Sequence, residues 1–232
     1  MGSEPRTASR RDSAVALLVA APAPSVGVLL SMFLVPGPVG NAAYAIGKAV
    51  LYGTPAAWRL LVERKRPSFR GCSARAAAAG LAVGLVMAGG ILAIGHLAGD
   101  RLVDAGRLRA AAEAAGITTP LRFVLLATWL SLVNSLLEEY AFRWFMTERL
   151  EAILPRGAVL ASAGIFTAHH VLVLLAYAPP PAVAIGSLAV FAAGLAWTEL
   201  YRRTRSIVPG WISHLLADVA IFAIGYRLLF PA

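Results

Sequence analysis

Seven long apolar runs separated by short polar connectors make up most of the chain. Each run approaches or exceeds the length of about 20 residues that an α-helix needs to cross the hydrocarbon core of a bilayer. None of them alternates apolar and polar residues with a period of two, which argues against strands. The pattern predicts an all-α fold, a polytopic transmembrane helix bundle of about seven spans. The predicted spans are Ala14–Val35, Val39–Leu61, Ala76–Leu97, Phe123–Met146, Gly157–Ala176, Pro181–Leu200 and Ile207–Phe230.

Composition supports a membrane protein. Of 232 residues, 59% are hydrophobic and 14% are charged, whereas soluble domains are typically about 45–50% apolar and about 25% charged. The single cysteine, Cys72, excludes an intrachain disulfide framework. The net charge of +9 could suit nucleic acid, but the basic residues gather in connectors between apolar runs. We therefore expect the lipid bilayer as a partner and no nucleic acid.

The basic connectors alternate with connectors of low charge, which predicts the orientation. Arginines gather in the N-terminal tail and after the second, fourth and sixth runs, whereas residues 36–38 and 177–180 carry no charge. The positive-inside rule then places the N-terminus in the cytoplasm and the C-terminus outside. Because arginine far outnumbers lysine, we expect a bacterial protein. The seven spans make it a multi-pass protein, which we expect in the plasma (inner) membrane. The predicted segments are a cytoplasmic tail (1–13), N-terminal helices (14–98), an extracytoplasmic connector with an amphipathic helix (99–120) and a catalytic core (121–232).

Ionisable side chains lie inside three of the seven runs, where each costs free energy and therefore suggests function. The first three runs carry little of this kind beyond Lys48 and Arg59. Three of the four histidines fall in the later runs. The groups are Glu138, Glu139 and Arg143 in the fourth run, His169 and His170 in the fifth, and His214 and Asp218 in the seventh.

Helical spacing separates the two adjacent carboxylates. Glu139 and Arg143 are four residues apart, so they share a face and can pair, which lowers the cost of both charges in apolar surroundings. Glu138 points about 100° away on an α-helix and has no obvious partner on its own helix. We therefore expect Glu138 to be the carboxylate available for chemistry.

The same spacing places side chains on the other two helices. His214 and Asp218 share one face, and Phe166 and His170 share another, whereas His169 points away from His170. We expect His169 to be a packing residue. Three helices can thus bring a carboxylate and two imidazoles to one level below the membrane surface.

These groups suit hydrolysis. A buried carboxylate can take a proton from water, and a neighbouring imidazole can orient that water. A second imidazole can donate a hydrogen bond to the oxyanion that forms on the attacked carbonyl. No serine or cysteine lies beside these groups in a nucleophile setting, which argues against a covalent intermediate.

Other readings of the same residues stay open. Glu138, His170 and His214 could bind zinc, since two imidazoles and a carboxylate form a hydrolytic ligand set, although we expect no cofactor. The polar groups could instead be relay groups of a proton-coupled transporter, a network that only ties helices together, or a remote case of bis-histidine haem binding. A non-catalytic immunity protein would carry the same motifs.

Three motifs, in order and on separate spans, resemble those of the CAAX protease and bacteriocin-processing (Abi) family of intramembrane glutamic endopeptidases. They are Glu138 and Glu139 with Arg143, Phe166 with His170, and His214 with Asp218. The resemblance covers Trp129–Ala220. It implies an intramembrane endopeptidase that cuts a membrane-associated peptide or protein tail: a prenylated C-terminus in the eukaryotic branch, and peptides or sorting tails in bacterial relatives. It implies catalytic roles for Glu138, His170, His214 and Asp218, with Glu139, Arg143 and Phe166 supporting them.

Two positions depart from the family pattern. Asp218 stands where asparagine is most common, so it must be protonated to donate to an oxyanion, or instead hold the tautomer of His214. Trp144 stands where a small glycine is common, and we expect it either to narrow the pocket or to face lipid. Five other aromatic residues are expected in interfacial belts. These are Trp58, Trp197, Trp211, Tyr201 and Tyr226.

Overall fold

The computed structural model describes residues 9–65 and 69–231, with only the backbone of residues 99–101. Residues 1–8 of the predicted tail and Arg66 of the following basic connector lie outside the described residues. Within them the only regular elements are helices, some with π-helical segments (η). They are α1 (Arg10–Ala20), α2 (Ala23–Leu29), η1 (Leu30–Leu34), α3 (Pro38–Ala57), η2 (Trp58–Val62), α4 (Ala74–Leu102), α5 (Ala105–Ala114), α6 (Pro120–Trp129), η3 (Leu130–Asn134), α7 (Ser135–Glu138), η4 (Glu139–Thr147), α8 (Glu148–Ile153), α9 (Ala158–Tyr177), α10 (Pro180–Thr204) and α11 (Val208–Leu229).

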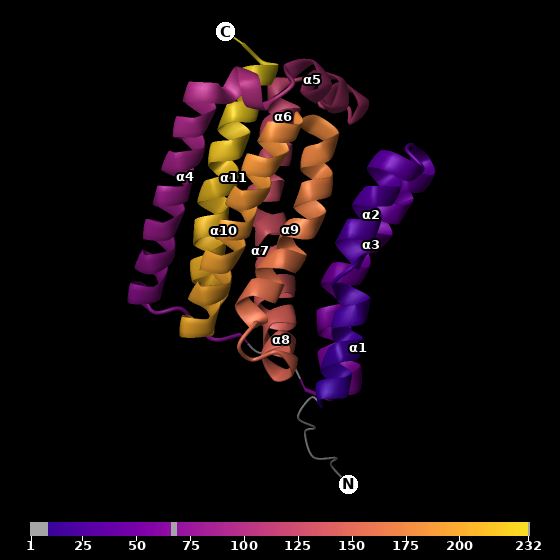
Figure 1. Cartoon of the computed structure of the whole chain (residues 1–232), viewed down its shortest axis with the longest axis vertical. Coiled ribbons are helices and arrows are strands. Elements are labelled where there is room, and N and C mark those ends of the chain that lie inside the picture. Colours follow the sequence, from indigo (N-terminus) through magenta and orange to yellow (C-terminus); the bar gives the residue numbers. More distant parts are fainter. Residues whose placement is uncertain (1–8, 66–68, 232) are drawn as a thin grey trace.

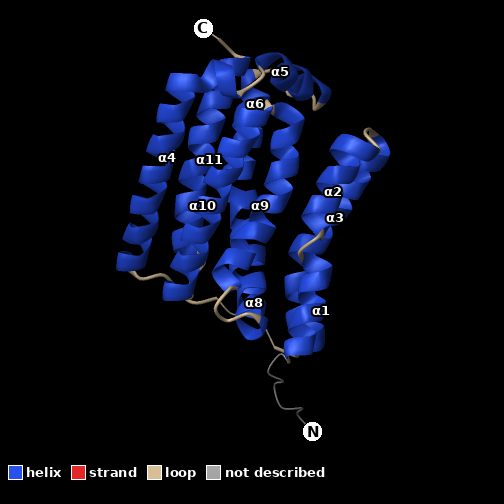
Figure 2. Ribbon diagram, in the orientation of Figure 1, coloured by secondary structure: helices blue, strands red, loops and turns tan. Residues whose placement is uncertain are grey.

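These elements form rods of membrane-spanning length. Among the described residues, six helices are long and apolar enough to cross a membrane, including α1 to η1 and the continuous rod from α6 to α8. The rod of α3 and η2, where the span Val39–Leu61 was expected, is not among these six, and it runs back beside α1 and α2 (Figure 1). The all-α transmembrane fold predicted from the sequence is therefore confirmed, and Figure 2 shows helices joined by short loops.

Local sequence signals set the helix ends. Ser9 begins α1 with a capping box, in which its hydroxyl accepts from the backbone of Asp12 and the Asp12 carboxylate accepts in return. Threonine and proline begin α6, where the Thr119 hydroxyl accepts from the backbone N–H of Arg122. Proline interrupts the first rod, because α1 ends at Ala20 and α2 begins at Ala23, directly after Pro22.

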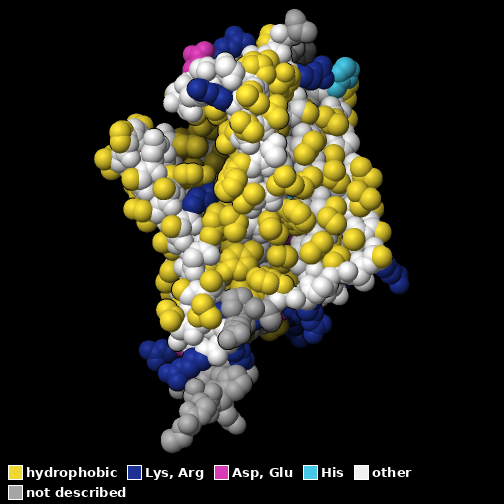
Figure 3. Space-filling model, turned by 180° about the vertical axis from the view of Figure 1, so that it is seen from behind, with side chains coloured by type: hydrophobic (Ala, Val, Ile, Leu, Met, Phe, Trp, Pro, Cys, Tyr) yellow, Lys and Arg dark blue, Asp and Glu magenta, His cyan; other side chains and the backbone are white. Residues whose placement is uncertain are grey.

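The rods are arranged as a five-membered body with a separate pair beside it. The body consists of rods that stand side by side, namely α4, α11, α10, α9 and α6–α8 (Figure 1). Next to it stand the rod from α1 to η1 and the rod of α3 and η2, which we call the α1–α3 pair. The two termini lie at opposite ends of the bundle. Helix α5 lies across the end that carries the C-terminus, within the connector 99–120 where an amphipathic helix was expected. Hydrophobic side chains cover the middle of the bundle (Figure 3).

Glycines allow α4 and α11 to pack closely. A Cβ atom at Gly80 would lie 2.7 Å from the Cα atom of Pro209, and one at Gly84 would lie 2.8 Å from the Cα atom of Ser213. These glycines are four residues apart and share one face of α4, which is the small-residue spacing that lets membrane helices approach each other. The close approach fixes the start of α11, which carries His214.

Ion pairs join the α1–α3 pair to the body at the end that carries the N-terminus. Arg149 of α8 pairs with Glu63, which follows η2. Arg59 of η2 lies 2.5 Å from Glu63 and 3.5 Å from Glu148. These contacts hold the lower part of α3 against the rod that carries the first motif.

Candidate active site

The first and third motifs meet where an α-helix changes to a π-helix. Glu138 is the last residue of α7 and Glu139 is the first of η4. Both carboxylates face His214 of α11: Glu138 Oε2 lies 3.8 Å from Nε2, and Glu139 Oε1 lies 3.2 Å from Nδ1. All three residues are at most 4% exposed. π-Helical segments occur often at functional sites, and here one follows directly after Glu138.

Glu139 and Arg143 form the expected contact across one turn. Arg143 Nε lies 3.6 Å from Glu139 Oε2, and both side chains are fully buried. Arg143 Nη1 also donates to Ser162 Oγ at 3.4 Å. Glu139 has almost no free space, because a Cβ atom at Gly210 of α11 would overlap its Oε2 atom. This carboxylate is therefore fixed between Arg143 and His214.

The fifth run contributes a histidine whose tautomer is set by the backbone. His170 Nδ1 lies 2.9 Å from the carbonyl oxygen of Phe166, which can only accept a hydrogen bond, so Nδ1 is the donor. In neutral His170 the Nε2 atom then carries the lone pair. The Phe166 ring stands 4.4 Å from the His170 ring and 5.9 Å from the His214 ring, so it packs between the two imidazoles.

Glu138 also faces α9. Potential ligand atoms of Glu138, His169 and His170 all lie within 4.8 Å of one another. The His169 ring stacks on Phe142 at 5.6 Å. Glu138 thus lies between two helices that carry imidazoles, His170 on one side and His214 on the other.

Asp218 is near His214 but does not hold it. Its Oδ1 atom is 3.8 Å from Nε2 of His214, which is beyond hydrogen-bond distance. The group that sets the orientation of His214 is Glu139, at the other ring nitrogen. Asp218 instead lines an apolar cavity of about 490 Å³ between α4, α9, α10 and α11, together with Phe166 and Trp197.

Sequence reasoning missed the partners of Glu138. Lys48 of α3 lies 3.2 Å from Glu138 Oε1, and Asn134 donates to the same oxygen at 3.0 Å. Asn134 is four residues before Glu138 on the same rod, so the spacing rule that paired Glu139 with Arg143 could have found it. No spacing rule links Lys48 to Glu138, because the two are 90 residues apart in the sequence.

Two aromatic predictions were wrong. Trp197 and Tyr201 are 3% and 2% exposed and therefore do not lie in an interfacial belt. Trp197 stacks on His214 with ring centres 4.0 Å apart and donates to Ser213, while the Tyr201 hydroxyl contacts Glu148. Ser213 is buried and Glu148 is half-buried, and the apolar pattern of α10 reveals neither partner.

Trp144 does not face lipid. Its side chain is 3% exposed and stacks on Tyr140 at 5.2 Å, with Phe69 and Arg59 also against it. The large ring thus fills the space between η4 and the α1–α3 pair.

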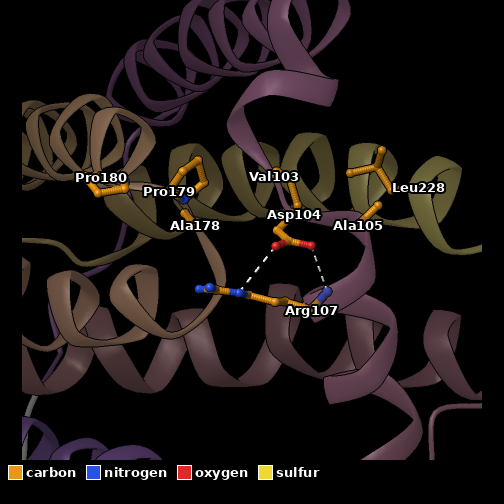
Figure 4. Close-up of a pocket in the computed structure, with 8 residues that line it drawn as sticks. All are labelled: Val103, Asp104, Ala105, Arg107, Ala178, Pro179, Pro180 and Leu228. Atoms are coloured by element: carbon orange, nitrogen blue, oxygen red, sulfur yellow. Dashed lines mark hydrogen bonds and ion pairs between the residues drawn. The ribbon is translucent and has the colours of Figure 1, made fainter.

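A second cavity lies apart from these groups, at the end of the bundle that carries α5. It has a volume of about 540 Å³, and Asp104 and Arg107 pair inside it at 3.3 Å (Figure 4). Its other lining residues are Val103, Ala105, Ala178, Pro179, Pro180 and Leu228, and none belongs to the three motifs.

Comparison with known proteins gives one match. No curated protein and no solved structure matches the chain. Residues 120–220 match the model of the family described as Rce1-like type II CAAX prenyl endopeptidases. This segment contains α6 to α10 and the first half of α11, and with them every residue of the three motifs. Over residues 120–220 the chain is therefore similar to Rce1-like type II CAAX prenyl endopeptidases, in agreement with the resemblance drawn from the three motifs.

Proposed function

We propose that this protein hydrolyses a peptide bond in a membrane-associated peptide or protein tail, with water activated by Glu138. The observation that carries the proposal is the position of Glu138, 4% exposed, with Oε2 3.8 Å from His214 and with His170 on its other side. A buried carboxylate beside two imidazoles can serve as a general base.

The arrangement supports a separate role for each imidazole. Glu138 takes a proton from a water molecule, whose oxygen attacks the substrate carbonyl carbon. The C–N bond of the intermediate then breaks, and Glu138 returns the proton to the leaving amine nitrogen. His170 Nε2, with its lone pair facing away from the backbone contact, accepts a hydrogen bond from that water and orients it. His214 stabilises the oxyanion that forms on the attacked carbonyl. Glu139 holds its Nδ1 atom, and a protonated His214 also has a donor at Nε2, which faces the oxyanion.

The apolar cavity suggests where the substrate lies. It reaches from Asp218 and Phe166 along α4 and α10, and almost all of its lining residues are apolar. A substrate with an apolar chain near the scissile bond would fill it, and the prenyl group in the name of the matched family is such a chain. Asp218, on the cavity wall, would then lie close to the reacting carbonyl, where its protonated form could donate a hydrogen bond.

The experiment is cleavage of a quenched fluorescent peptide by the protein in lipid vesicles. The peptide ends in a cysteine-containing tetrapeptide and is used with and without a farnesyl group. Glu138→Gln keeps the size of the side chain but removes the base, so kcat should fall by about 100- to 10,000-fold. Folding, followed by thermal melting, checks that the variant is intact. Wild-type cleavage rates in the Glu138→Gln protein would disprove the proposal.

A zinc-dependent form of the reaction is the second candidate. Glu138 gathers with His169 and His170, whereas the ligand set expected from the sequence contained His214 in place of His169. Two imidazoles and a carboxylate suit zinc, but the ammonium group of Lys48, 3.2 Å from Glu138 Oε1, competes for the same oxygen. Activity that survives strong chelators supports the glutamate mechanism, and loss that zinc restores supports the metal.

A further inference from the structure

The α1–α3 pair contributes a cation to the candidate base. Lys48 projects from α3 toward α7, with Nζ 3.2 Å from Glu138 Oε1. Its side chain is 20% exposed, and that of Glu138 is 5% exposed. Figure 3 shows a hollow between the lobe formed by α2 and α3 and the rest of the bundle, so the pair meets the body over a limited area.

All three protons of the Lys48 ammonium have acceptors. Besides Glu138, Nζ donates to the Tyr52 hydroxyl at 3.0 Å and to Asn134 Oδ1 at 3.1 Å. The Tyr52 hydroxyl also donates to Asn134 Oδ1 at 2.8 Å. An ammonium group has three donors, so this set fixes the position of the charge.

The contacts divide the two oxygens of Glu138. Lys48 and the Asn134 amide both donate to Oε1, at 3.2 and 3.0 Å. Oε2 instead faces His214 Nε2 at 3.8 Å. One oxygen is therefore fixed to the scaffold, and the other points to the space where a water molecule would be activated.

The Lys48–Glu138 contact also balances the charge of the buried carboxylate. A buried carboxylate without a partner costs several kcal/mol, and a hydrogen-bonded cation offsets this cost. Arg143 offsets the charge of Glu139, and Lys48 does the same for Glu138. The first of these pairs lies inside the matched segment 120–220, whereas Lys48 lies outside it.

We propose that Lys48 is a positioning residue for Glu138, which fixes Oε1 and balances its charge so that Oε2 is directed at the attacking water. The inference rests on the proposed function of Glu138. It assigns to the α1–α3 pair a part in catalysis: the pair completes the surroundings of the base.

The test compares Lys48→Met, Lys48→Arg and Lys65→Met in the vesicle cleavage assay. Lys65, the other lysine of the chain, lies in the loop after η2 and serves as the matched control. For Lys48→Met we expect kcat to fall on the order of 100-fold, as a misplaced reacting group does, with KM changed less than threefold. Lys48→Arg should recover part of kcat, and Lys65→Met should match the wild type. A kcat for Lys48→Met equal to that of the wild type overturns the inference.

A second measurement tests the Lys48–Glu138 contact without any catalysis. Thermal melting of Lys48→Met, Glu138→Gln and the double variant forms a double-mutant cycle. Each single variant leaves a buried charge unpaired, so the double variant should lose less melting temperature than the sum of the single losses. Additive losses would overturn the inference. If the wild type cleaves nothing while the cycle shows coupling, the proposed function has failed and the contact stands.

Discussion

Replacing Gly210 by alanine tests how strictly His214 must be held. Gly210 lies in the first turn of α11, facing Glu139. A Cβ atom there would overlap Glu139 Oε2 and stand 3.2 Å from its Cδ atom. Because nonbonded carbon atoms pack at about 3.5–4.0 Å, the carboxylate must withdraw by about 1 Å. No solvent-filled space accepts it, since Glu139 is fully buried.

The size of the effect follows from the contacts that this movement breaks. Glu139 Oε1 accepts from His214 at 3.2 Å, and a hydrogen bond to a charged group contributes about 1.5–3 kcal/mol. Alanine gains up to about 1 kcal/mol of helix propensity over glycine. The net loss of stability is then about 0.5–2 kcal/mol, or roughly 1–8 °C in melting temperature for a chain of this size. The loss of kcat should be far larger, on the order of 100-fold, because His214 is no longer oriented.

The assay is peptide cleavage in vesicles beside thermal melting of the same preparation. Gly89→Ala is the matched control, since a Cβ atom at Gly89 of α4 meets nothing within 4 Å. We expect the control to keep wild-type activity and to melt at the same or a slightly higher temperature. If Gly210→Ala cleaves as fast as the control, Glu139 does not position His214 and the reasoning is refuted.

Two further predictions concern stability and orientation. Glu139→Gln should leave Arg143 as an unpaired buried charge and lower the free energy of unfolding by about 3–5 kcal/mol. Its melting temperature and expression should therefore fall more than those of Glu138→Gln, and equal melting temperatures of the two variants would contradict this. Reporter fusions after Arg70 and Arg205 should report the cytoplasm and one after Pro180 the exterior, and a cytoplasmic signal after Pro180 would reverse the predicted orientation.

The hydrophobic pattern predicted six of the seven spans closely, and Val39–Leu61 is the one that the apolar helices of the described residues do not include. The fourth run, expected at Phe123–Met146, lies within the rod Pro120–Ile153, and the fifth, expected at Gly157–Ala176, is α9 at Ala158–Tyr177. This success has a physical reason, since the hydrocarbon thickness fixes the length of an apolar helix. The pattern could not show the π-helical segments, because a shift from one hydrogen-bond register to the next leaves the apolar composition unchanged.

Residue spacing predicted contacts within one helix, but it could not predict contacts between helices. The Glu139–Arg143 contact follows from the four-residue separation. The same reasoning placed Glu138 and Glu139 on different faces, yet both reach His214, one at each ring nitrogen. The imidazole is long enough to meet two neighbouring side chains from one rod. A rule that assigns one partner to each face does not allow for this.

Aromatic residues near helix ends were the least predictable. Trp197 has the sequence position of an interfacial residue but stacks on His214. An amphipathic ring gains as much from a buried hydrogen-bond partner as from the headgroup region, and here Ser213 is that partner. Only the packing of α10 against α11 decides between the two environments.

The charges of the site are arranged so that a membrane bundle can hold them. Lys48 pairs with Glu138 and Arg143 with Glu139, so each glutamate has its own cation. His214 lies between the two carboxylates and need not balance either of them. In the proposed mechanism His214 is an imidazolium, and its Nε2 can donate to charge that develops on a substrate, as stabilisation of an oxyanion requires. Burying ionised groups near lipid costs free energy. Two ion pairs of the scaffold, Lys48 with Glu138 and Arg143 with Glu139, offset this free energy before the reaction begins.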